Sequence, residues 1–470
     1  MTLLDPIPVL PADDVSPVHF IAIGGAGMSG IAQLYAERGI EVTGSDQADS
    51  PTLRRLAASG IRTYVGHRAE QIGNARTVVV SSAVKESNPE LAAARDKGLL
   101  VWHRSAALAA LMLGRTAISI TGTHGKTTTS AMTAMMLTAA GADPSYVVGA
   151  PLQSSGSSAH LGAGSTFVVE ADESDGSFRQ YPTVVAVVTN IEADHLDNWG
   201  TPEAYAAGYV QFCTSRTVRV VILDADDPGC RRLAAALEGG SSPVTTVGES
   251  ESADIRLTDI MDSRGTASAT LTWPGGIGEI RLSFPGRHNL HNAAAAFAVG
   301  HYLGLDPRQL LDGASRFAGT ERRFQLVAEV GGIRIVDDYA HHPTEIAATL
   351  SAARGAAGAG RVVACFQPHL YSRTRDFAVD FGRALAAADV VMVTDVYAAR
   401  EDPMPGVTSE LVVTAARDAG ADVSYVPALS DVPAALAELA RDGDLILTLG
   451  AGDITTAGPA LARLLEAGRG

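Results

Sequence analysis

The interpretation of the chain depends on one stretch, Thr121-Gly122-Thr123-His124-Gly125-Lys126-Thr127-Thr128-Thr129. It follows an apolar run, Thr116–Ile120, that predicts a buried strand, and it precedes a helical pattern at 130–140. A glycine turn between strand and helix, with a lysine followed by a hydroxyl residue, is typical of a phosphate-binding loop. Ile120 stands where the full pattern has a further glycine, so this is a shortened variant. The alternative, threonine hydroxyls that only cap a helix, does not explain the lysine.

Composition and charge limit the classes of protein that fit. The chain has 470 residues with 46% hydrophobic content, which predicts two to four globular domains. A net charge of -16 argues against nucleic acid as the main partner. Three widely spaced cysteines form no metal or disulfide pattern. The start of the chain lacks a signal-peptide pattern and no apolar run is long enough to span a membrane, so we expect a cytoplasmic protein without membrane insertion.

A second glycine pattern lies near the N-terminus. Gly25-x-Gly27-x-x-Gly30 follows a strand-like run at 19–23, and Asp46 comes 19 residues after Gly27. Strands and helices alternate from there to residue 112, which predicts a parallel sheet with helices on its faces. The pattern indicates a dinucleotide site, or more broadly a diphosphate on a helix N-terminus with the acid near a ribose or base. Purely structural glycines are the alternative.

Acidic residues follow two predicted strands of the middle segment. Phe167–Glu173 is a strand whose end carries three acids, and the strand at 184–190 is followed by Glu192, Asp194 and His195. Residues just past strand ends line the ligand crevice of an open α/β sheet. Beside a phosphate loop, such groups can hold Mg²⁺ against phosphates. A solvated acidic loop is the alternative for any one of these acids.

The last third of the chain predicts another α/β unit. Runs at 326–330 and 333–336 flank Gly331-Gly332 and predict a hairpin. Asp337-Asp338-Tyr339-Ala340-His341-His342-Pro343 follows at the strand end. Strands and helices then alternate to the C-terminus, with a helix expected at 376–387. The sequence therefore predicts a second Rossmann-like unit.

Taken together, these motifs resemble the Mur ligase family. The motifs that carry the resemblance are Gly24–Gly30, Thr121–Thr129, Glu170–Asp175, Thr189–His195, Gly286–Asn292, Arg323–Gln325, Asp337–Pro343, Phe366–His369 and Leu449–Asp453. The resemblance implies an α/β fold of three domains. Residues 1–113 would form a Rossmann-like domain for a UDP-linked substrate, 114–320 a central P-loop ATPase domain, and 321–470 a C-terminal Rossmann-like domain that brings an amino acid.

The resemblance also implies a reaction. ATP would phosphorylate the lactyl carboxylate of UDP-N-acetylmuramate, and the amine of L-alanine would attack the acyl phosphate. His124 is similar to the alanine-adding members, and the absence of lysine between His195 and Arg219 argues against members that use a carbamylated lysine. Leu370 departs from the arginine of many relatives. The alternatives are a ligase that adds a whole tripeptide to the same UDP-sugar, an NAD(P)-dependent oxidoreductase, and a nucleotide-gated binding module without catalysis.

Site residues carried over from the resemblance fall into four groups, with ATP and Mg²⁺ as cofactors and a monomer or homodimer as the expected assembly. The ATP group is Gly122, Thr123, His124, Gly125, Lys126, Thr127, Thr128, His288, Asn292, Arg323 and Asp338. The UDP-substrate group is Gly25, Ala26, Gly27, Met28, Ser29, Asp46, Ser81 and Ser82. The metal group is Thr127, which would hold one Mg²⁺, and Glu170 with His195, which would hold a second. The catalytic group is Lys126, His341 and His342, which would orient or deprotonate the amine, and Arg373, which would hold the amino-acid carboxylate.

Overall fold

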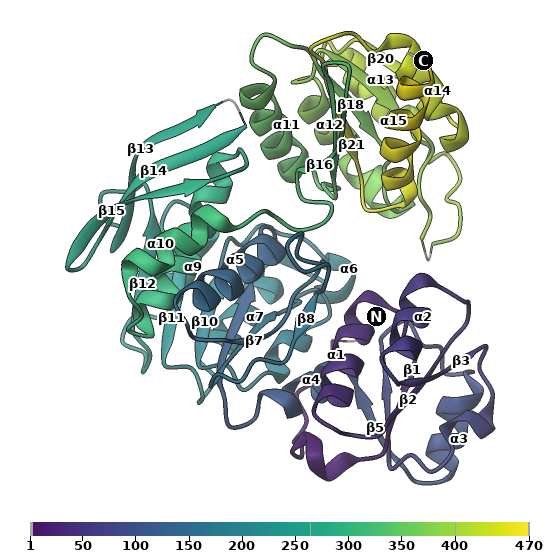
Figure 1. Ribbon diagram of the computed structural model, residues 1–470, viewed down its shortest axis with the longest axis vertical. Helices are drawn as coiled ribbons and strands as arrows, with labels where there is room; N and C mark the ends of the chain where they lie inside the picture. The colour runs from purple at the N-terminus through teal and green to yellow at the C-terminus, as the bar shows by residue number, and fades with distance from the viewer. Residues whose placement is uncertain (1–2, 264, 400, 469–470) are drawn as a thin grey trace. The chain divides into compact units, whose positions relative to one another are not determined.

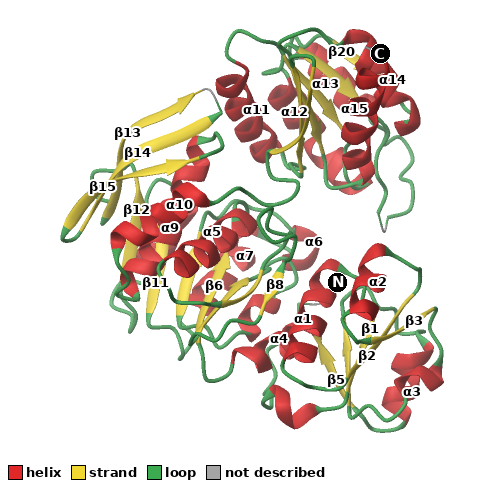
Figure 2. Cartoon of the chain, viewed as in Figure 1, coloured by secondary structure: helices red, strands yellow, loops and turns green. Residues whose placement is uncertain are grey.

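A computed structural model describes residues 3–263, 265–399 and 401–468 of the protein. Within those residues the strands form three sheets, drawn with their helices in Figures 1 and 2. The chain divides into two compact units. One unit comprises Met1–Leu257, Leu271–Gly278 and His291–Ala314, and the other comprises Thr258–Thr270, Glu279–Leu290 and Ser315–Gly470.

The N-terminal sheet has the strand order β3-β2-β1-β4-β5, and all its pairs are parallel. Its strands are β1 (Val18–Ile21), β2 (Val42–Asp46), β3 (Arg62–Val65), β4 (Thr77–Val80) and β5 (Leu100–His103). Its helices are α1 (Ala26–Glu37), α2 (Pro51–Ala58), α3 (Pro89–Asp96) and α4 (Arg104–Met112). Phe20 and Val79 pack in the same core as α1 and α4, while Ile21 and Val78 face α3. Alternate strand residues thus cover opposite faces, as a parallel sheet requires.

The central sheet has the order β15-β14-β13-β12-β11-β10-β6-β9-β7-β8. Its strands are β6 (Thr116–Thr121), β7 (Ser145–Val147), β8 (Ala159–His160), β9 (Thr166–Glu170), β10 (Val185–Val188), β11 (Val220–Asp224), β12 (Val244–Gly248), β13 (Ile255–Ser263), β14 (Thr266–Trp273) and β15 (Gly276–Leu282). Its helices are α5 (Lys126–Ala139), α6 (Leu196–Trp199), α7 (Pro202–Cys213), α8 (Pro228–Ala236), α9 (Arg287–Tyr302) and α10 (Pro307–Arg316). The core around α1 and α4 continues into Tyr209 and Phe212 of α7, so the two sheets share buried residues.

The C-terminal sheet has the order β16-β17-β21-β18-β19-β20. Its strands are β16 (Gln325–Val330), β17 (Ile333–Asp338), β18 (Val362–Phe366), β19 (Val390–Val393), β20 (Val423–Tyr425) and β21 (Leu445–Leu449). Its helices are α11 (Pro343–Ala357), α12 (Tyr371–Leu385), α13 (Glu410–Asp418), α14 (Val432–Leu439) and α15 (Ala457–Ala467). Only β16 runs antiparallel to its neighbour among the described pairs. Helices α11 and α12 cover one face and α14 and α15 the other, as Figure 1 shows.

The predicted fold class, three α/β domains with parallel sheets, is confirmed. The predicted hairpin around Gly331-Gly332 is the antiparallel pair of β16 and β17. The helix expected at 376–387 is wrong at its start, because α12 begins at Tyr371. Leu370 turns the chain with φ of 70°, and its carbonyl accepts a hydrogen bond from the Thr374 hydroxyl. This turn lacks the glycine that usually marks a positive φ, so the sequence pattern did not show it.

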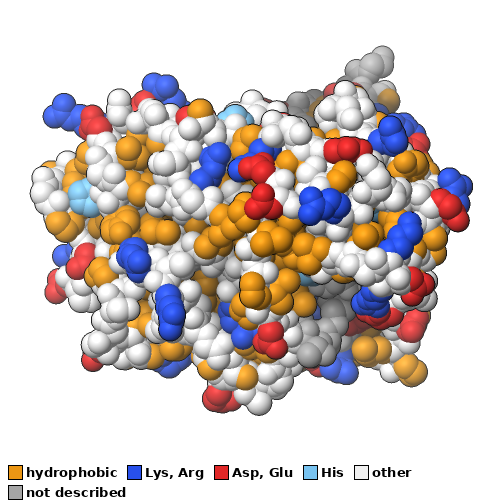
Figure 3. Space-filling model, turned by 90° about the horizontal axis from the view of Figure 1, so that it is seen from below, with side chains coloured by type: hydrophobic (Ala, Val, Ile, Leu, Met, Phe, Trp, Pro, Cys, Tyr) orange, Lys and Arg blue, Asp and Glu red, His pale blue; other side chains and the backbone are white. Residues whose placement is uncertain are grey.

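On the face of the molecule that Figure 3 shows, side chains of both charges are mixed. Figure 3 shows Lys and Arg side chains interspersed with Asp and Glu side chains and with apolar ones. The net charge of -16 is therefore not gathered into one patch on that face. The helices that the structure describes are too short or too polar to span a lipid bilayer.

Candidate active site

The order of the central strands brings three loops to one edge of the sheet. Strand β6 lies between β9 and β10 and is parallel to both. The segments that follow these strands therefore leave the sheet at the same end. They are the phosphate loop, the acidic run that begins at Glu170, and the run 189–195. The predicted gathering of these motifs is borne out by the strand order.

The phosphate loop has a backbone that its neighbours hold in place. A Cβ on Gly122, where φ is 129°, would lie 2.2 Å from Thr189 Oγ1. The His124 N–H donates to Asn190 Oδ1 (2.8 Å), and the His124 carbonyl accepts from Asn190 Nδ2 and from Thr189 Oγ1 (3.0 and 2.6 Å). Thr123 Oγ1 donates to the carbonyl of Glu192 (2.9 Å). The loop is thus clamped by the segment that follows β10.

Lys126 begins α5 and is held at the centre of this loop. Its Nζ donates to the carbonyls of Gly122 and Thr123 (2.6 and 3.0 Å) and to Glu173 Oε1 (2.9 Å). Burial disfavours the ammonium, but the carboxylates of Glu173 and Asp172 together raise the pKa of Lys126 above its ordinary value. The site therefore holds a fixed positive charge at neutral pH.

Glu173 was not among the predicted site residues. Its side chain is fully buried and accepts from Lys126, from the Thr121 hydroxyl (3.4 Å) and from the Tyr205 hydroxyl (3.5 Å). The sequence did show a signal, because Glu173 belongs to the acidic run after β9. What the sequence did not show is which acid of that run turns inward to meet the lysine.

Glu170 and His195 were predicted to hold one Mg²⁺, and Thr127 was predicted to hold another. Glu170 ends β9, and its Oε2 accepts from the Gly149 N–H (2.7 Å). His195 has φ of 54°, and its Nε2 lies 3.6 Å from Asp194 Oδ2 and 3.9 Å from Glu173 Oε1. Within the described part of the chain, Glu170 and His195 share no hydrogen bond or ion pair with each other. Thr127 is buried in the first turn of α5.

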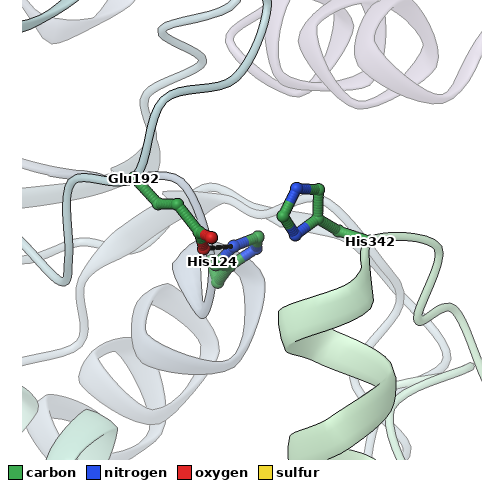
Figure 4. A group of neighbouring side chains, drawn as sticks. All are labelled: His124, Glu192 and His342. Carbon is green, nitrogen blue, oxygen red and sulfur yellow. Dashed lines mark hydrogen bonds and ion pairs between the residues drawn. The ribbon is translucent and has the colours of Figure 1, made fainter. Parts of the chain in front are cut away.

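His124 has a defined partner next to the loop. Figure 4 shows its ring Nε2 hydrogen bonded to Glu192 Oε2 (2.9 Å). The figure also draws His342, which belongs to the other compact unit and is the N-cap of α11. His342 accepts from the Thr344 N–H (3.4 Å), and its ring packs edge-on against Phe377.

Two residues of the predicted ATP group, His288 and Asn292, lie on helix α9. Asn292 is buried against the phosphate loop, since a Cβ on Gly125 would lie 2.7 Å from Asn292 Oδ1. His288 lies one turn earlier, and its ring folds back on Gly286, where a Cβ would lie 2.7 Å from the ring Cε1. Asn289, between these two residues, donates from Nδ2 to the carbonyl of Pro285 (2.8 Å).

Arg323 and Asp338 both belong to the start of the C-terminal sheet. Asp338 ends β17 and is buried, with Oδ2 accepting from the Phe324 N–H (2.7 Å) and Oδ1 from the Ala340 N–H (2.8 Å). Burial raises the pKa of Asp338 to about 6, against the opposing effect of Arg323. The Arg323 guanidinium lies over the Tyr339 ring. Asp338 is therefore buried and anchors this turn through two backbone hydrogen bonds. Its predicted contact with ATP stays a prediction.

A cluster of rings gathers at the strand ends of the C-terminal sheet. His341 packs edge-on against Tyr339 and His369, and His369 stacks on Tyr397. Burial lowers the pKa of His341 to about 3, and Arg373 acts in the same direction. The His341 ring is therefore neutral at neutral pH. The sequence predicted His341 and Arg373, but not the participation of His369 and Tyr397 in this cluster.

The N-terminal glycine turn is fixed mainly by one carboxylate. The Gly24 N–H donates to Asp46 Oδ2 (2.9 Å), and the Gly25 carbonyl accepts from the Met28 and Ser29 N–H groups (both 2.9 Å). Gly27 lies in the first turn of α1, where N–H groups have no acceptor within the helix. Asp46, predicted near the uridine, thus also supports the turn.

Ser81 and Ser82 follow β4, the strand that lies beside β1 in the N-terminal sheet. Ser82 Oγ donates to Asp175 Oδ2 (3.2 Å) and lies 3.1 Å from His103 Nε2. The Ser81 carbonyl accepts from the Val84 N–H (3.1 Å). Ser82 therefore connects the N-terminal sheet with the acidic run of the central sheet.

The clamped loop, its lysine and the acids around it define a nucleotide-binding protein of the kind that handles phosphoryl groups. Comparison with protein families narrows this class. The model of the Mur ligase family catalytic domain matches residues 17–116, the Mur ligase middle domain matches 120–300, and the Mur ligase glutamate ligase domain matches 322–452. The chain belongs to the Mur ligase family. This membership leaves no support for the oxidoreductase alternative.

Individual relatives agree with the family. The chain is 59% identical to the UDP-N-acetylmuramate–L-alanine ligase of Cutibacterium acnes, with 99% of each chain covered. It is 53% identical to the enzyme of the same name from Kineococcus radiotolerans, with 95% of this chain and 96% of the relative covered. The solved UDP-N-acetylmuramate–alanine ligase of Thermotoga maritima matches with a TM-score of 0.81 at 28% identity, covering 96% of this chain and 99% of that one.

The solved structure of a different ligase is also similar. The murein peptide ligase of Psychrobacter arcticus matches with a TM-score of 0.70 at 25% identity, covering 95% of this chain and 98% of that one. The fold alone therefore does not separate alanine-adding from peptide-adding members.

Proposed function

We propose that the chain ligates L-alanine to the lactyl carboxylate of UDP-N-acetylmuramate at the expense of ATP, the first peptide-adding step of peptidoglycan precursor synthesis. The observation that carries the proposal is Lys126, held in a clamped phosphate loop among strand-end acids. The names of the relatives at 59% and 53% identity support the particular substrates.

The chemistry needs an activated carboxylate, because hydroxide is a poor leaving group. The lactyl carboxylate attacks the γ-phosphorus of ATP, forming an acyl phosphate and releasing ADP. The amine of L-alanine then attacks the acyl carbon, and phosphate leaves. The first step depends on positioning and on neutralising phosphate charge. Lys126, charged because of its carboxylate neighbours, supplies that charge at the β- and γ-phosphates.

Mg²⁺ fits the residues predicted to hold it. Glu170 uses Oε2 for the Gly149 N–H, and its Oε1 has no hydrogen-bond partner among the described residues. A carboxylate oxygen and the Thr127 hydroxyl are the hard ligands that Mg²⁺ prefers, whereas the imidazole of His195 is a less usual one. When bound, the ion would neutralise charge on the phosphates. Thr127 would hold one such ion beside Lys126, and Glu170 with His195 would hold a second.

For the remaining groups the proposal assigns binding roles. Asn292, which lies on Gly125, and His288 would contact the adenine, and Arg323 would reach the ATP phosphates. His341 is neutral, and its low pKa makes it a weak base, so we assign it to orienting the alanine amine. Arg373 would bind the alanine carboxylate.

Phosphate release tests the proposal. The purified chain would be supplied with ATP, Mg²⁺ and UDP-N-acetylmuramate, with and without L-alanine. We expect release only with both substrates, and loss of release in Lys126→Ala. The matched control is Lys97→Ala, which removes an exposed lysine at the end of α3. Release with the tripeptide L-alanyl-γ-D-glutamyl-meso-diaminopimelate but not with L-alanine would transfer the assignment to the peptide-adding type. No release with either would contradict a ligase.

A further inference from the structure

Arg104 lies where the N-terminal glycine turn meets the central sheet. It is the first residue of α4 and follows β5 directly. Its guanidinium lies on Gly27, since a Cβ there would be 3.1 Å from Nη1 and 3.5 Å from Cζ. The cation therefore occupies the space beside the first turn of α1 that any larger residue at position 27 would fill.

The other side of the same guanidinium faces the acidic run after β9. Nη2 lies 3.3 Å from Asp172 Oδ2, and Asp172 directly precedes Glu173, the partner of Lys126. Ser82 makes a second contact between the same segments, because its Oγ donates to Asp175 Oδ2 and also lies 3.1 Å from Nε2 of His103, the residue before Arg104. Arg104 thus joins the turn expected to bind the UDP-substrate to the residues that surround the phosphate loop.

Arg104 has more hydrogen-bonding capacity than it uses. A guanidinium carries five N–H donors. The bond to Asp172 is the one that Arg104 makes among the described residues, and at 3.3 Å it is longer than the 2.7–2.9 Å usual for an ion pair. The side chain is only 21% exposed. A largely buried guanidinium with a single long hydrogen bond has N–H donors left for a second, anionic acceptor.

We infer that Arg104 binds the diphosphate of the UDP-sugar and, through Asp172, aligns that substrate with the phosphate loop. This inference rests on the proposed function, which supplies the diphosphate. The chemistry is that of a planar guanidinium with phosphate oxygens, assisted by the backbone N–H groups at the start of α1. Nothing in the order of the sequence marks Arg104, because it lies 77 positions after Gly27 and takes its place only in the folded protein.

Equilibrium binding distinguishes this role from a structural one. Dissociation constants for UDP-N-acetylmuramate and for ATP would be measured by calorimetry on the wild type, Arg104→Met, Arg104→Lys and Asp172→Asn. Loss of a charged hydrogen-bond partner predicts a roughly 10–100-fold weaker UDP-N-acetylmuramate complex in Arg104→Met. Arg104→Lys should recover part of this loss, because lysine keeps the positive charge but lacks the planar set of N–H donors of the guanidinium. Binding of ATP should change less than about twofold.

Asp172→Asn separates substrate binding from domain packing. If Arg104 serves only its ion pair with Asp172, the two single variants should weaken UDP-N-acetylmuramate equally, and that result would overturn the inference. If Arg104 binds the diphosphate, Asp172→Asn should leave affinity for the UDP-sugar within about threefold. The matched control is Arg38→Met, which breaks an Arg–Asp pair at the other end of α1 and should leave both constants unchanged.

A second ligand identifies the bound group. UDP-N-acetylglucosamine has the diphosphate but lacks the lactyl carboxylate, so its competition with UDP-N-acetylmuramate should weaken in Arg104→Met by the same factor. An effect on UDP-N-acetylmuramate alone would place Arg104 on the carboxylate and contradict the inference. If the wild type ligates alanine and Arg104→Met binds UDP-N-acetylmuramate as tightly as the wild type does, the inference is wrong while the proposed function stands. A wild type that neither binds UDP-N-acetylmuramate nor ligates alanine would overturn the proposed function.

Discussion

The chain contains two strand–glycine turn–helix motifs that obtain their positive charge in different ways. The turn after β6 carries its own cation, Lys126, at the first position of the helix it opens. The turn after β1 has no lysine or arginine between Gly24 and Gly30, and its nearby cation is Arg104 at the start of α4. A local cation is visible in the sequence, whereas one supplied by another helix is visible only in the fold.

The two turns also differ in how rigidly they are held. Gly122 and the His124 backbone are clamped by Thr189 and Asn190 after β10. The N-terminal turn depends on one carboxylate, Asp46, bonded to the Gly24 N–H. We therefore expect substitutions in the phosphate loop to have larger effects than equivalent changes in the N-terminal turn.

The largest effect is expected from Lys126→Ala. Fixed charge at a phosphoryl-transfer site contributes several kcal/mol, so kcat should fall by about 10²–10³-fold or more. Removal of the ammonium also leaves Glu173 buried without its cation, so the Tm should fall too. Steady-state phosphate release and thermal unfolding would measure both. A variant with wild-type kcat would show that the loop does not serve ATP in the way proposed.

Gly122→Ala should come second. The new Cβ would lie 2.2 Å from Thr189 Oγ1 and 2.9 Å from the Asn190 carbonyl, at a φ that alanine rarely adopts. Strain of about 1–3 kcal/mol plus the clash should distort the loop and weaken ATP binding by roughly 10²-fold. Calorimetric titration with ATP would measure the loss. ATP affinity within threefold of the wild type would mean that Thr189 and Asn190 move easily. The proposed difference in rigidity between the two turns would then be wrong.

These two residues also show what the sequence was able to predict. Lys126 and Gly122 were predicted because their order between a strand and a helix is itself the signal. The alternation of strands and helices likewise predicted the N-terminal and C-terminal α/β units, and the resemblance to the family implied three domains. Glu173, His369 and Tyr397 were not predicted, because each becomes a site neighbour only when strand ends meet across a sheet. Arg104 was missed for the same reason, since α4 reaches Gly27 from a strand two places away in the sheet.

Asp172 links the two turns and gives a pH test of that link. Burial opposes its ionisation, but Arg104 and Lys126 lower the pKa of Asp172 to about 2. A carboxyl with a lowered pKa stabilises the folded state above its ordinary value of 3.8, and this stabilisation is lost as the pH falls through about 2. Since the carboxylate is partly exposed and screened, we expect about 1 kcal/mol at neutral pH.

Urea unfolding of the wild type and of Asp172→Asn at several pH values would measure this contribution of Asp172 to the free energy of unfolding. The wild type should be the more stable protein at pH 6, and the difference should shrink as the pH falls from about 4 toward 2. Asp418→Asn, which changes an exposed acid at the end of α13, is the matched control. A difference between wild type and Asp172→Asn that does not depend on pH would show that the charge of Asp172 is not what joins the two turns.

The smallest effect is expected from Gly27→Ala. Its Cβ would lie 3.1 Å from Arg104 Nη1, which is the end of a flexible side chain and can move by a few tenths of an ångström. Alanine is the better helix former, so the Tm should stay the same or rise slightly. The displaced guanidinium should raise the KM for UDP-N-acetylmuramate by roughly two- to fivefold, about 0.4–1 kcal/mol, with the KM for ATP unchanged.

Gly30→Ala provides the matched control on the same helix. Its Cβ would also meet a neighbour at 3.1 Å, but that neighbour is the Ala159 Cβ and not a cation. Crowding at Gly30 should lower the Tm without changing either KM, whereas crowding at Gly27 should raise only the KM for UDP-N-acetylmuramate and should not lower the Tm. If both variants changed the KM for UDP-N-acetylmuramate equally, tight packing of α1 would account for the result. The position of Arg104 beside Gly27 would then not explain binding of the UDP-sugar.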